Sequence, residues 1–292
     1  MDILTIGEVL IDLTQTGKDA RGIPQFAANP GGAPANLAVA AARLGAQTAF
    51  IGKVGEDMFG SFLRSVLKKC NISDEGLVTD KVHNTTLAFV ELNEHGDRDF
   101  SFYRRFGADV FLEKSEVNEK IIRQSKIFHF GSLSLCAEPA RSATGYALDA
   151  AKRAGCLITY DPNYRAPLWE NESIAVERMK EHLDKVDILK IAKEELYMLF
   201  GNDEEAAIRT AMSSGIRVIL VTDGANGASL YMRNGRVSLP AEKVNTVDTT
   251  GAGDIFFGTF LHEWLKNNST LADITVEKAA QYLKKAIAVA GK

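Results

Sequence analysis

Short apolar runs alternate with amphipathic stretches along most of the chain. The apolar runs predict strands, and the stretches whose apolar residues recur every three to four positions predict helices. Strands are predicted at 3–10, 48–54, 127–131, 157–161, 188–191 and 218–222, and helices at 33–44, 59–69, 140–154, 176–183 and 253–265. This alternation predicts an α/β fold of the doubly wound kind, a mainly parallel sheet with helices on both faces.

Two segments, 13–28 and 85–105, depart from this alternation. In the second, the apolar runs 86–92 and 98–103 flank a short polar stretch that contains Gly96. A glycine-containing turn between two such runs predicts a β-hairpin. We therefore expect a single domain over residues 1–292, in which both segments form a small antiparallel β lid over the strand ends. Such a lid excludes water from a reacting site.

Composition narrows the possible functions. Hydrophobic residues make up 46% of the 292, enough for a large core. The formal charge of −4 is spread along the chain without a basic stripe, so nucleic acid is not an expected partner. No apolar stretch approaches the roughly 20 residues that span a bilayer, and no basic segment with a long apolar run opens the chain. We expect no membrane partner and a cytoplasmic location. The 3 cysteines are odd in number and have no CxxC partners, so we expect them to be reduced. The 5 histidines lack metal-ligand spacing, so we expect no zinc site.

The most informative segment is 248–254, with the sequence DTTGAGD, directly before an apolar helix. Gly251 and Gly253 let the backbone turn tightly, and the free N–H groups at a helix start form a pocket for an anion such as phosphate. Asp254 can accept a proton from a hydroxyl whose oxygen attacks phosphorus. Taken alone, GAGD also fits a structural turn in which Asp254 only caps the helix.

Two further segments carry groups that suit a sugar. The sequence GGAPAN at 31–36 opens a predicted helix, where Gly31 and Gly32 allow close approach to the backbone and Asn36 can donate to and accept from hydroxyls. Asp12 follows the first predicted strand, at the edge where doubly wound sheets bind ligands. Asp12 is therefore a plausible acceptor for two hydroxyls.

Together, DTTGAGD and GGAPAN resemble the two signatures of ribokinase-type carbohydrate kinases, and GGAPAN has the form typical of their fructokinase branch. Further similar segments follow in the family's order: YR at 103–104, DPNYR at 161–165, KIAKEE at 190–195 and TDGANG at 222–227. The resemblance extends from residue 3 to about 291. It implies a ribokinase-like fold, ATP and Mg²⁺ as requirements, and a sugar bound between the lid and the main sheet.

The resemblance also implies residue roles. Asp254 is the expected base, and charge on the phosphoryl group is expected to be neutralised by Arg165 and by the amides of Gly251, Ala252 and Gly253. The expected sugar contacts are Asp12, Gly31, Gly32, Asn36, Tyr103, Asp161 and Asn163. One of the neighbouring arginines, Arg104 or Arg105, is expected to join them, and Arg104 is favoured because it adjoins the tyrosine.

For the nucleotide, the resemblance implies contacts from Lys190, Thr222, Gly224, Gly227 and Thr249. Glu195 matches a glutamate that holds the metal and its waters, although Ala192 replaces the asparagine that many relatives have three residues earlier. Asp248 and Thr250 are the expected ligands for K⁺. Relatives continue past the position of Lys292 into a loop that borders adenine.

These motifs favour ATP-dependent phosphorylation of the 6-hydroxyl of D-fructose, giving fructose 6-phosphate and ADP. A 2-keto-3-deoxygluconate kinase is an alternative, because Arg105 could serve an acidic substrate. A sugar-sensing protein that uses the same fold without catalysis is another. The exposed strand edges of the lid also predict a homodimer formed lid to lid.

Overall fold

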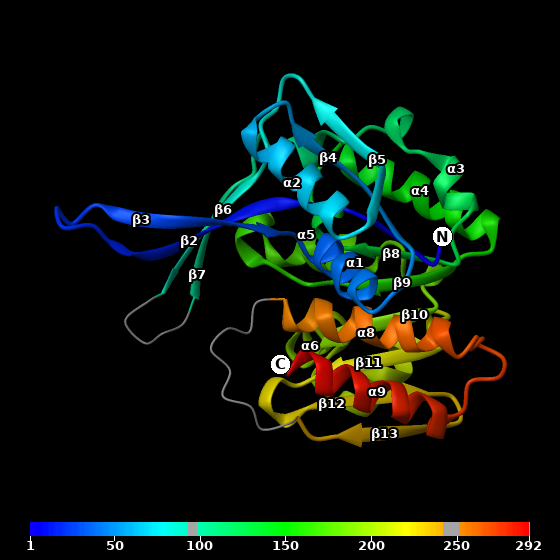
Figure 1. Cartoon of the computed structure of the whole chain (residues 1–292). Helices are drawn as coiled ribbons and strands as arrows, with labels where there is room; N and C mark the ends of the chain where they lie inside the picture. Colours follow the sequence, from blue (N-terminus) through cyan, green and yellow to red (C-terminus); the bar gives the residue numbers. More distant parts are fainter. Residues whose placement is uncertain (93–97, 242–250, 292) are drawn as a thin grey trace.

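The computed structural model describes residues 1–92, 98–241 and 251–291, and within them a nine-stranded sheet forms the body of the protein (Figure 1). Its strands are β1 (Ile3–Ile6), β4 (Thr48–Gly55), β5 (Ile72–Asp80), β8 (Ile127–Gly131), β9 (Leu157–Asp161), β10 (Ile188–Ala192), β11 (Val218–Thr222), β12 (Ala228–Met232) and β13 (Gly235–Leu239). They lie in the order β13-β12-β11-β10-β9-β8-β1-β4-β5. From β11 to β5 all neighbours are parallel, and β12 and β13 add an antiparallel edge.

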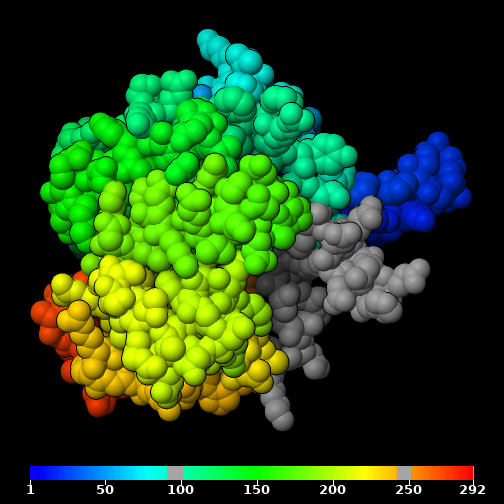
Figure 2. All heavy atoms as spheres, turned by 180° about the vertical axis from the view of Figure 1, so that it is seen from behind, coloured from blue at the N-terminus to red at the C-terminus, as the bar shows by residue number. Residues whose placement is uncertain are grey.

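Helices cover both faces of this sheet, which confirms the predicted doubly wound α/β class. One face carries α1 (Ala33–Arg43), α2 (Met58–Lys69), α8 (Ala252–Lys266) and α9 (Val276–Ala290). The other carries α3 (Glu119–Arg123), α4 (Ala140–Ala154), α5 (Glu172–Lys180), α6 (Lys193–Phe200) and α7 (Glu204–Ser213), which form the green to yellow-green surface in Figure 2. Neighbouring strand residues alternate between the two cores: Ile3 packs under the first layer and Leu4 under the second. Short 3-10 helices occupy Ala108–Phe111, Lys114–Glu116, Leu133–Leu135, Ala166–Leu168, Leu183–Lys185 and Gly224–Asn226.

A second, four-stranded sheet projects from one side of the body (Figures 1 and 2). It consists of β2 (Leu10–Lys18), β3 (Pro24–Gly31), β6 (Leu87–Leu92) and β7 (Arg98–Tyr103), in the order β3-β2-β6-β7. The pairs β2/β3 and β6/β7 are antiparallel, and β2 and β6 join them in parallel. These strands overlap both segments expected to form the lid, and we call this sheet the lid below.

Two predicted elements differ from the structure. The apolar run 3–10 forms two strands, because the chain leaves the body at Gly7 and enters the lid at Leu10. Gly7 has φ 148°, and a Cβ there would lie 2.7 Å from Pro34 Cγ. The helix expected at 176–183 instead spans Glu172–Lys180, where the Asn171 side chain accepts a hydrogen bond from Ile174 N and caps it. None of the described helices is long and apolar enough to cross a bilayer.

Candidate active site

The carboxyl ends of the parallel strands bring residues from distant parts of the chain to one edge of the body. Asp161 ends β9, Lys190 lies near the end of β10, and Thr222 ends β11. Helix α8 starts with Gly251 as its N-cap, at φ 76°. Such an edge is where open α/β sheets bind ligands, and the first N–H groups of a helix suit an anion.

Asp254 lies in the first turn of α8 and is 9% exposed. Its Oδ2 accepts a hydrogen bond from Asn36 Nδ2 at 2.9 Å, which joins the two signature segments across the sequence. Gly251, rather than Asp254, is the N-cap, and a Cβ on Gly251 would lie 3.6 Å from Asn36 Nδ2. The carboxylate therefore faces α1 and does not merely cap its own helix.

The surroundings of Asp254 suit a group that gains and loses a proton near neutral pH. Burial, followed by the charge of Asp161, raises the pKa of Asp254 to about 7. The hydrogen bond from Asn36 and the charges of Lys190 and Arg165 act in the opposite direction. A pKa near the working pH is what general base catalysis requires.

Lys190 and Asp161 form a buried ion pair beneath the start of α8. Lys190 Nζ lies 2.9 Å from Asp161 Oδ2, with side chains 8% and 4% exposed. Burial opposes the charge on Lys190, but Asp161 and Glu195 raise its pKa, so the ammonium stays protonated. A Cβ on Gly253 would lie 2.9 Å from Lys190 Nζ, so glycine leaves room for the ammonium group. The ammonium group of Lys190 therefore lies beside Gly253, at the start of α8.

Glu195 and Asp161 offer oxygen atoms to a cation in different ways. Glu195 Oε1 accepts from Tyr164 N at 2.6 Å and Oε2 from Ala192 N at 2.9 Å, whereas Asp161 Oδ1 is buried with no hydrogen-bond partner among the described residues. Burial, then the charge of Asp161, raises the pKa of Glu195. Mg²⁺ commonly binds through one or two carboxylates, its own waters and substrate phosphates. One unpartnered carboxylate oxygen beside a second acid fits such an ion.

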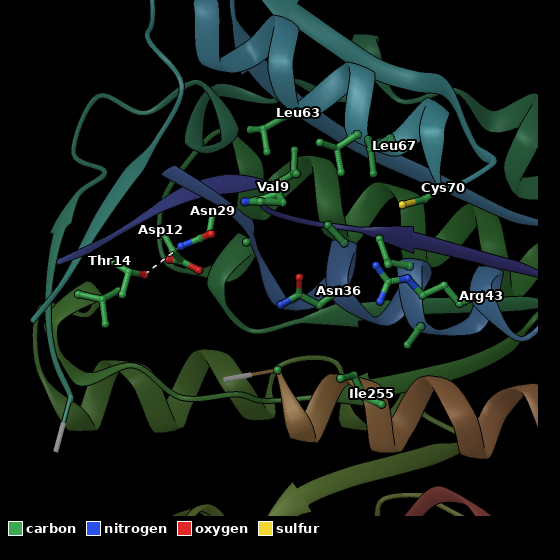
Figure 3. A pocket seen from close by; sticks show the side chains of 18 residues that line it. Val9, Asp12, Thr14, Asn29, Asn36, Arg43, Leu63, Leu67, Cys70 and Ile255 are labelled. Carbon is green, nitrogen blue, oxygen red and sulfur yellow. Dashed lines mark hydrogen bonds between the residues drawn. The ribbon is translucent and has the colours of Figure 1, made fainter. Parts of the chain in front are cut away.

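A cavity of about 340 Å³ opens between the lid and the body (Figure 3). Asp12 and Gly31 line it from the lid, Asn36 from α1 and Gly251 from the start of α8. A Cβ on Gly31 would lie 2.2 Å from Asp12 Oδ2, so glycine leaves the Asp12 carboxylate in its present position. Gly32 caps α1 at φ 105°. Four predicted sugar contacts thus gather around the N-termini of α1 and α8.

Thr14 and Asn29 also line this cavity, and sequence reasoning missed both. Asn29 Nδ2 donates to Thr14 Oγ1 at 3.1 Å, and Asn29 pairs with Asp12 across β2 and β3. The signal for Thr14 was present, because a residue two positions after Asp12 in a strand shares its face.

The two arginines after β7 differ in burial. Arg104 is 5% exposed, and its Nη2 lies 2.7 Å from Asp109 Oδ2 and donates to Leu133 O at 3.0 Å. Arg105 is exposed and lies over the ring of Phe106, 5.6 Å from its centroid. Arg104 is therefore the inward-facing arginine, and its contact with a sugar stays a prediction.

The other residues predicted to contact the sugar or the phosphates occupy separate places. Tyr103 is 68% exposed and packs beside Phe89. Asn163 adopts φ 47°, and Arg165 Nη1 donates to Tyr164 O at 3.0 Å. Of these, Arg165 is the one whose charge acts on Asp254.

The turn after β11 has two glycines in different surroundings. Gly224, at φ 48°, has no atom within 4 Å of an added Cβ, so a ligand can approach its backbone. At Gly227 the added Cβ would lie 2.1 Å from Leu239 O, so this glycine serves packing against β13. Beside the turn, Lys193 Nζ pairs with Asp223 Oδ2 at 2.8 Å. Asp248, Thr249 and Thr250 lie outside the described residues.

Residues 1–282 match the sequence profile of the pfkB family carbohydrate kinase. The chain belongs to this family. It is 42% identical over 275 residues to Fructokinase-1 of Oryza sativa subsp. japonica, covering 93% of this chain and 85% of that protein. Fructokinase with bound ATP from Xylella fastidiosa has a TM-score of 0.90 at 31% identity, covering 99% of this chain and 91% of that one.

A third relative of this carbohydrate kinase is Fructokinase from Vibrio cholerae O395. Its form bound to fructose, ADP and calcium ion has a TM-score of 0.87 at 31% identity and covers 100% of this chain and 92% of that one. A double mutant of the same protein was solved with fructose, ADP and potassium ion. The kinase described here is thus a phosphotransferase that acts on a sugar hydroxyl, with a ribokinase-like fold.

Proposed function

We propose that this kinase transfers the γ-phosphoryl group of ATP to the 6-hydroxyl of D-fructose, giving fructose 6-phosphate and ADP. One observation carries the proposal: the Asp254 carboxylate, held by Asn36 at 2.9 Å, sits at the start of α8 beside the cavity under the lid. The fructokinases reported above, together with GGAPAN at 31–36, support fructose as the sugar.

The reaction follows from this arrangement. Asp254 accepts the proton of the attacking hydroxyl, and Asn36 holds the carboxylate in place. The first N–H groups of α8 and the Arg165 guanidinium stabilise charge on the transferred phosphoryl group. Asp12, Thr14 and Asn29 present polar groups to the sugar from the lid side of the cavity. Closure of the lid excludes water, which would otherwise compete as the acceptor.

Mg²⁺ would be held by Asp161 Oδ1 and, through its waters, by Glu195, where it would neutralise charge on the nucleotide phosphates. Gly224 and Thr222 are the proposed nucleotide contacts at the end of β11. For K⁺, Asp248 and Thr250 remain the predicted ligands. Activity measured with and without potassium would test whether the kinase depends on this ion.

The substrate is tested by coupled ADP release with ATP and Mg²⁺ across D-fructose, 2-keto-3-deoxygluconate, ribose, glucose and nucleosides. We expect the highest kcat/KM for fructose. A higher value for 2-keto-3-deoxygluconate would keep the chemistry and change the sugar, although Arg105, the residue that favours this alternative, is exposed and lies over Phe106. Absence of turnover with every sugar would favour the sugar-sensing alternative.

We also propose a homodimer formed through the lid. Phe26, Phe89 and Tyr103 form an aromatic cluster with ring centroids 5.4 Å and 5.1 Å apart. Strand alternation places Phe89 on the lid face opposite Ala88, the partner of Asp12, so the cluster faces away from the sugar cavity. Phe26 and Tyr103 are 37% and 68% exposed, which suits burial by a second copy. A monomeric mass in solution scattering would contradict the dimer.

Cytoplasmic residence stays a prediction, which fractionation of the source cells would test.

A further inference from the structure

Glu8 lies where the chain leaves the body for the lid, and it is 2% exposed. Its Oε1 accepts a hydrogen bond at 3.0 Å from the backbone N–H of Ala33, the first residue of α1. The preceding Gly32 also rests on Glu8, since a Cβ there would lie 2.5 Å from Glu8 O. Glu8 therefore contacts the GGAPAN loop, which borders the sugar cavity, at Gly32 and Ala33.

The other carboxylate oxygen of Glu8 lies in a buried site on which the charges of Arg104 and Asp109 act. Oε2 is buried and has no hydrogen-bond partner within the described part of the chain. Burial raises the pKa of Glu8 to about 7, the Arg104 guanidinium acts against that rise, and Asp109 adds to it. A buried oxygen without a partner is costly, and such groups in native structures call for an explanation.

Arg104 and Asp109 fasten the β6/β7 hairpin of the lid to the body. Arg104 directly follows β7 and binds both Asp109 and the backbone oxygen of Leu133, which lies in the body. Thr86, directly before β6, donates from Oγ1 to Asp109 Oδ1. Of the four points at which the chain crosses between body and lid, those near residues 8 and 32 are thus held by Glu8, and those near 86 and 104 by Asp109. The charge of Glu8 acts on Arg104 and links the two groups.

We propose that Glu8 is a positioning residue that couples the lid to the sugar-binding loop. One carboxylate oxygen holds the loop at Ala33, and the negative charge holds Arg104 and, through it, the exit of the lid. Movement of the lid over the sugar and the position of the loop beneath it are thereby linked. The inference rests on the proposed function, because the sugar is what the lid and the loop enclose.

The test is Glu8→Gln, assayed at pH 8, where the wild-type carboxylate is charged. Glutamine keeps the side-chain size and an acceptor for Ala33 N–H but removes the charge that acts on Arg104. We expect the KM for the sugar to rise about 10-fold, with kcat and the KM for ATP within about twofold of wild type. We also expect the sugar to protect the backbone amides of 10–31, 87–92 and 98–103 less against hydrogen exchange than in wild type.

Asp187→Asn is the matched control. Asp187 directly precedes β10, at the amino ends of the parallel strands, away from the cavity. Its Oδ2 likewise accepts a backbone hydrogen bond, from Ile158 N at 2.9 Å, and its Oδ1 lies 3.7 Å from Lys152 Nζ. This variant is expected to lower thermal stability without changing the KM for the sugar. A Glu8→Gln variant that loses stability like the control but keeps the wild-type KM would overturn the proposal.

Two further arms keep the test decisive. If Glu8→Gln does not fold, Thr86→Val takes its place. It removes the hydrogen bond from Thr86 to Asp109, the partner of Arg104, with little change of shape, and it must show the same rise in KM. A wild-type KM in Thr86→Val would overturn the proposal. If the wild-type enzyme prefers another sugar to fructose, the substrate proposal fails by itself. The variants are then compared with the preferred sugar, so the two failures are distinguishable.

Discussion

Replacing Asp254 with asparagine is expected to lower kcat by about 10²- to 10⁴-fold, the usual contribution of a general base. Asparagine keeps the size of the side chain and can still pair with Asn36, but it cannot accept the hydroxyl proton. The nucleotide contacts proposed at the end of β11 remain, so the Kd for ATP is expected to change little. Coupled ADP release measures the first quantity, and titration calorimetry with ATP the second.

Asp203→Asn is the control for this substitution. Asp203 also stands at a helix start, where it caps α7 by accepting from Ala206 N at 2.7 Å, but it lies away from the cavity. It is expected to keep the wild-type kcat. If Asp254→Asn also kept it, Asp254 could not be the base.

The same variant gives a second readout, the pH dependence of stability. The pKa of Asp254 is about 7 in the folded protein and 3.8 for the ordinary side chain, so the folded state binds the proton more tightly. Stability from this proton is complete below about pH 4 and is lost as the pH rises towards 7. Asparagine does not ionise. Asp254→Asn is therefore expected to be more stable than wild type at pH 8, by roughly 4 kcal/mol from the pKa difference, and the gap should shrink at pH 4.5. Urea unfolding at both pH values measures it.

The sequence predicted the elements that carry the chemistry better than the contacts between them. Periodicity located α4 and β9 with the bounds seen in the structure, and it placed the start of α8 within one residue. The split between β1 and β2 was missed, because an apolar run looks alike whether it continues in one sheet or passes into another. The apolar pattern records burial, and both sheets bury these residues.

Contacts that depend on register could not be read from the sequence. The contact of Lys190 with the nucleotide stays a prediction, whereas its ion pair with Asp161 was not predicted, because only the alignment of β9 against β10 reveals it. The direction of Arg104 depends on Asp109, which follows a turn. Glu8 was visible only as part of a strand end, since its importance comes from Ala33 and Arg104, far away in the chain.

Lys190→Met is expected to lower the free energy of unfolding by about 3–5 kcal/mol, the usual cost of removing one partner from a buried ion pair. Methionine fills the space of the lysine stem but leaves Asp161 without its cation at 2.9 Å. The charges of Glu195 and Asp254 also act on Lys190, so its loss affects three carboxylates at once. Urea unfolding at pH 8, above the pKa of about 7 to which burial raises Asp254, gives the largest difference.

Lys193→Met is the matched control, because Lys193 forms an ion pair of similar length, 2.8 Å with Asp223, at a site where both side chains are about one-third exposed. Solvent screens such a pair, so the expected loss is at most about 1 kcal/mol. An equal loss in both variants would mean that the burial of Lys190 has no special effect.

The double variant Lys190→Met with Asp161→Asn decides the cause. If the penalty comes from an uncompensated buried charge, removing that charge restores part of the stability. A double variant less stable than Lys190→Met would place the effect in packing instead, and the lysine would no longer be the counter-ion of the site.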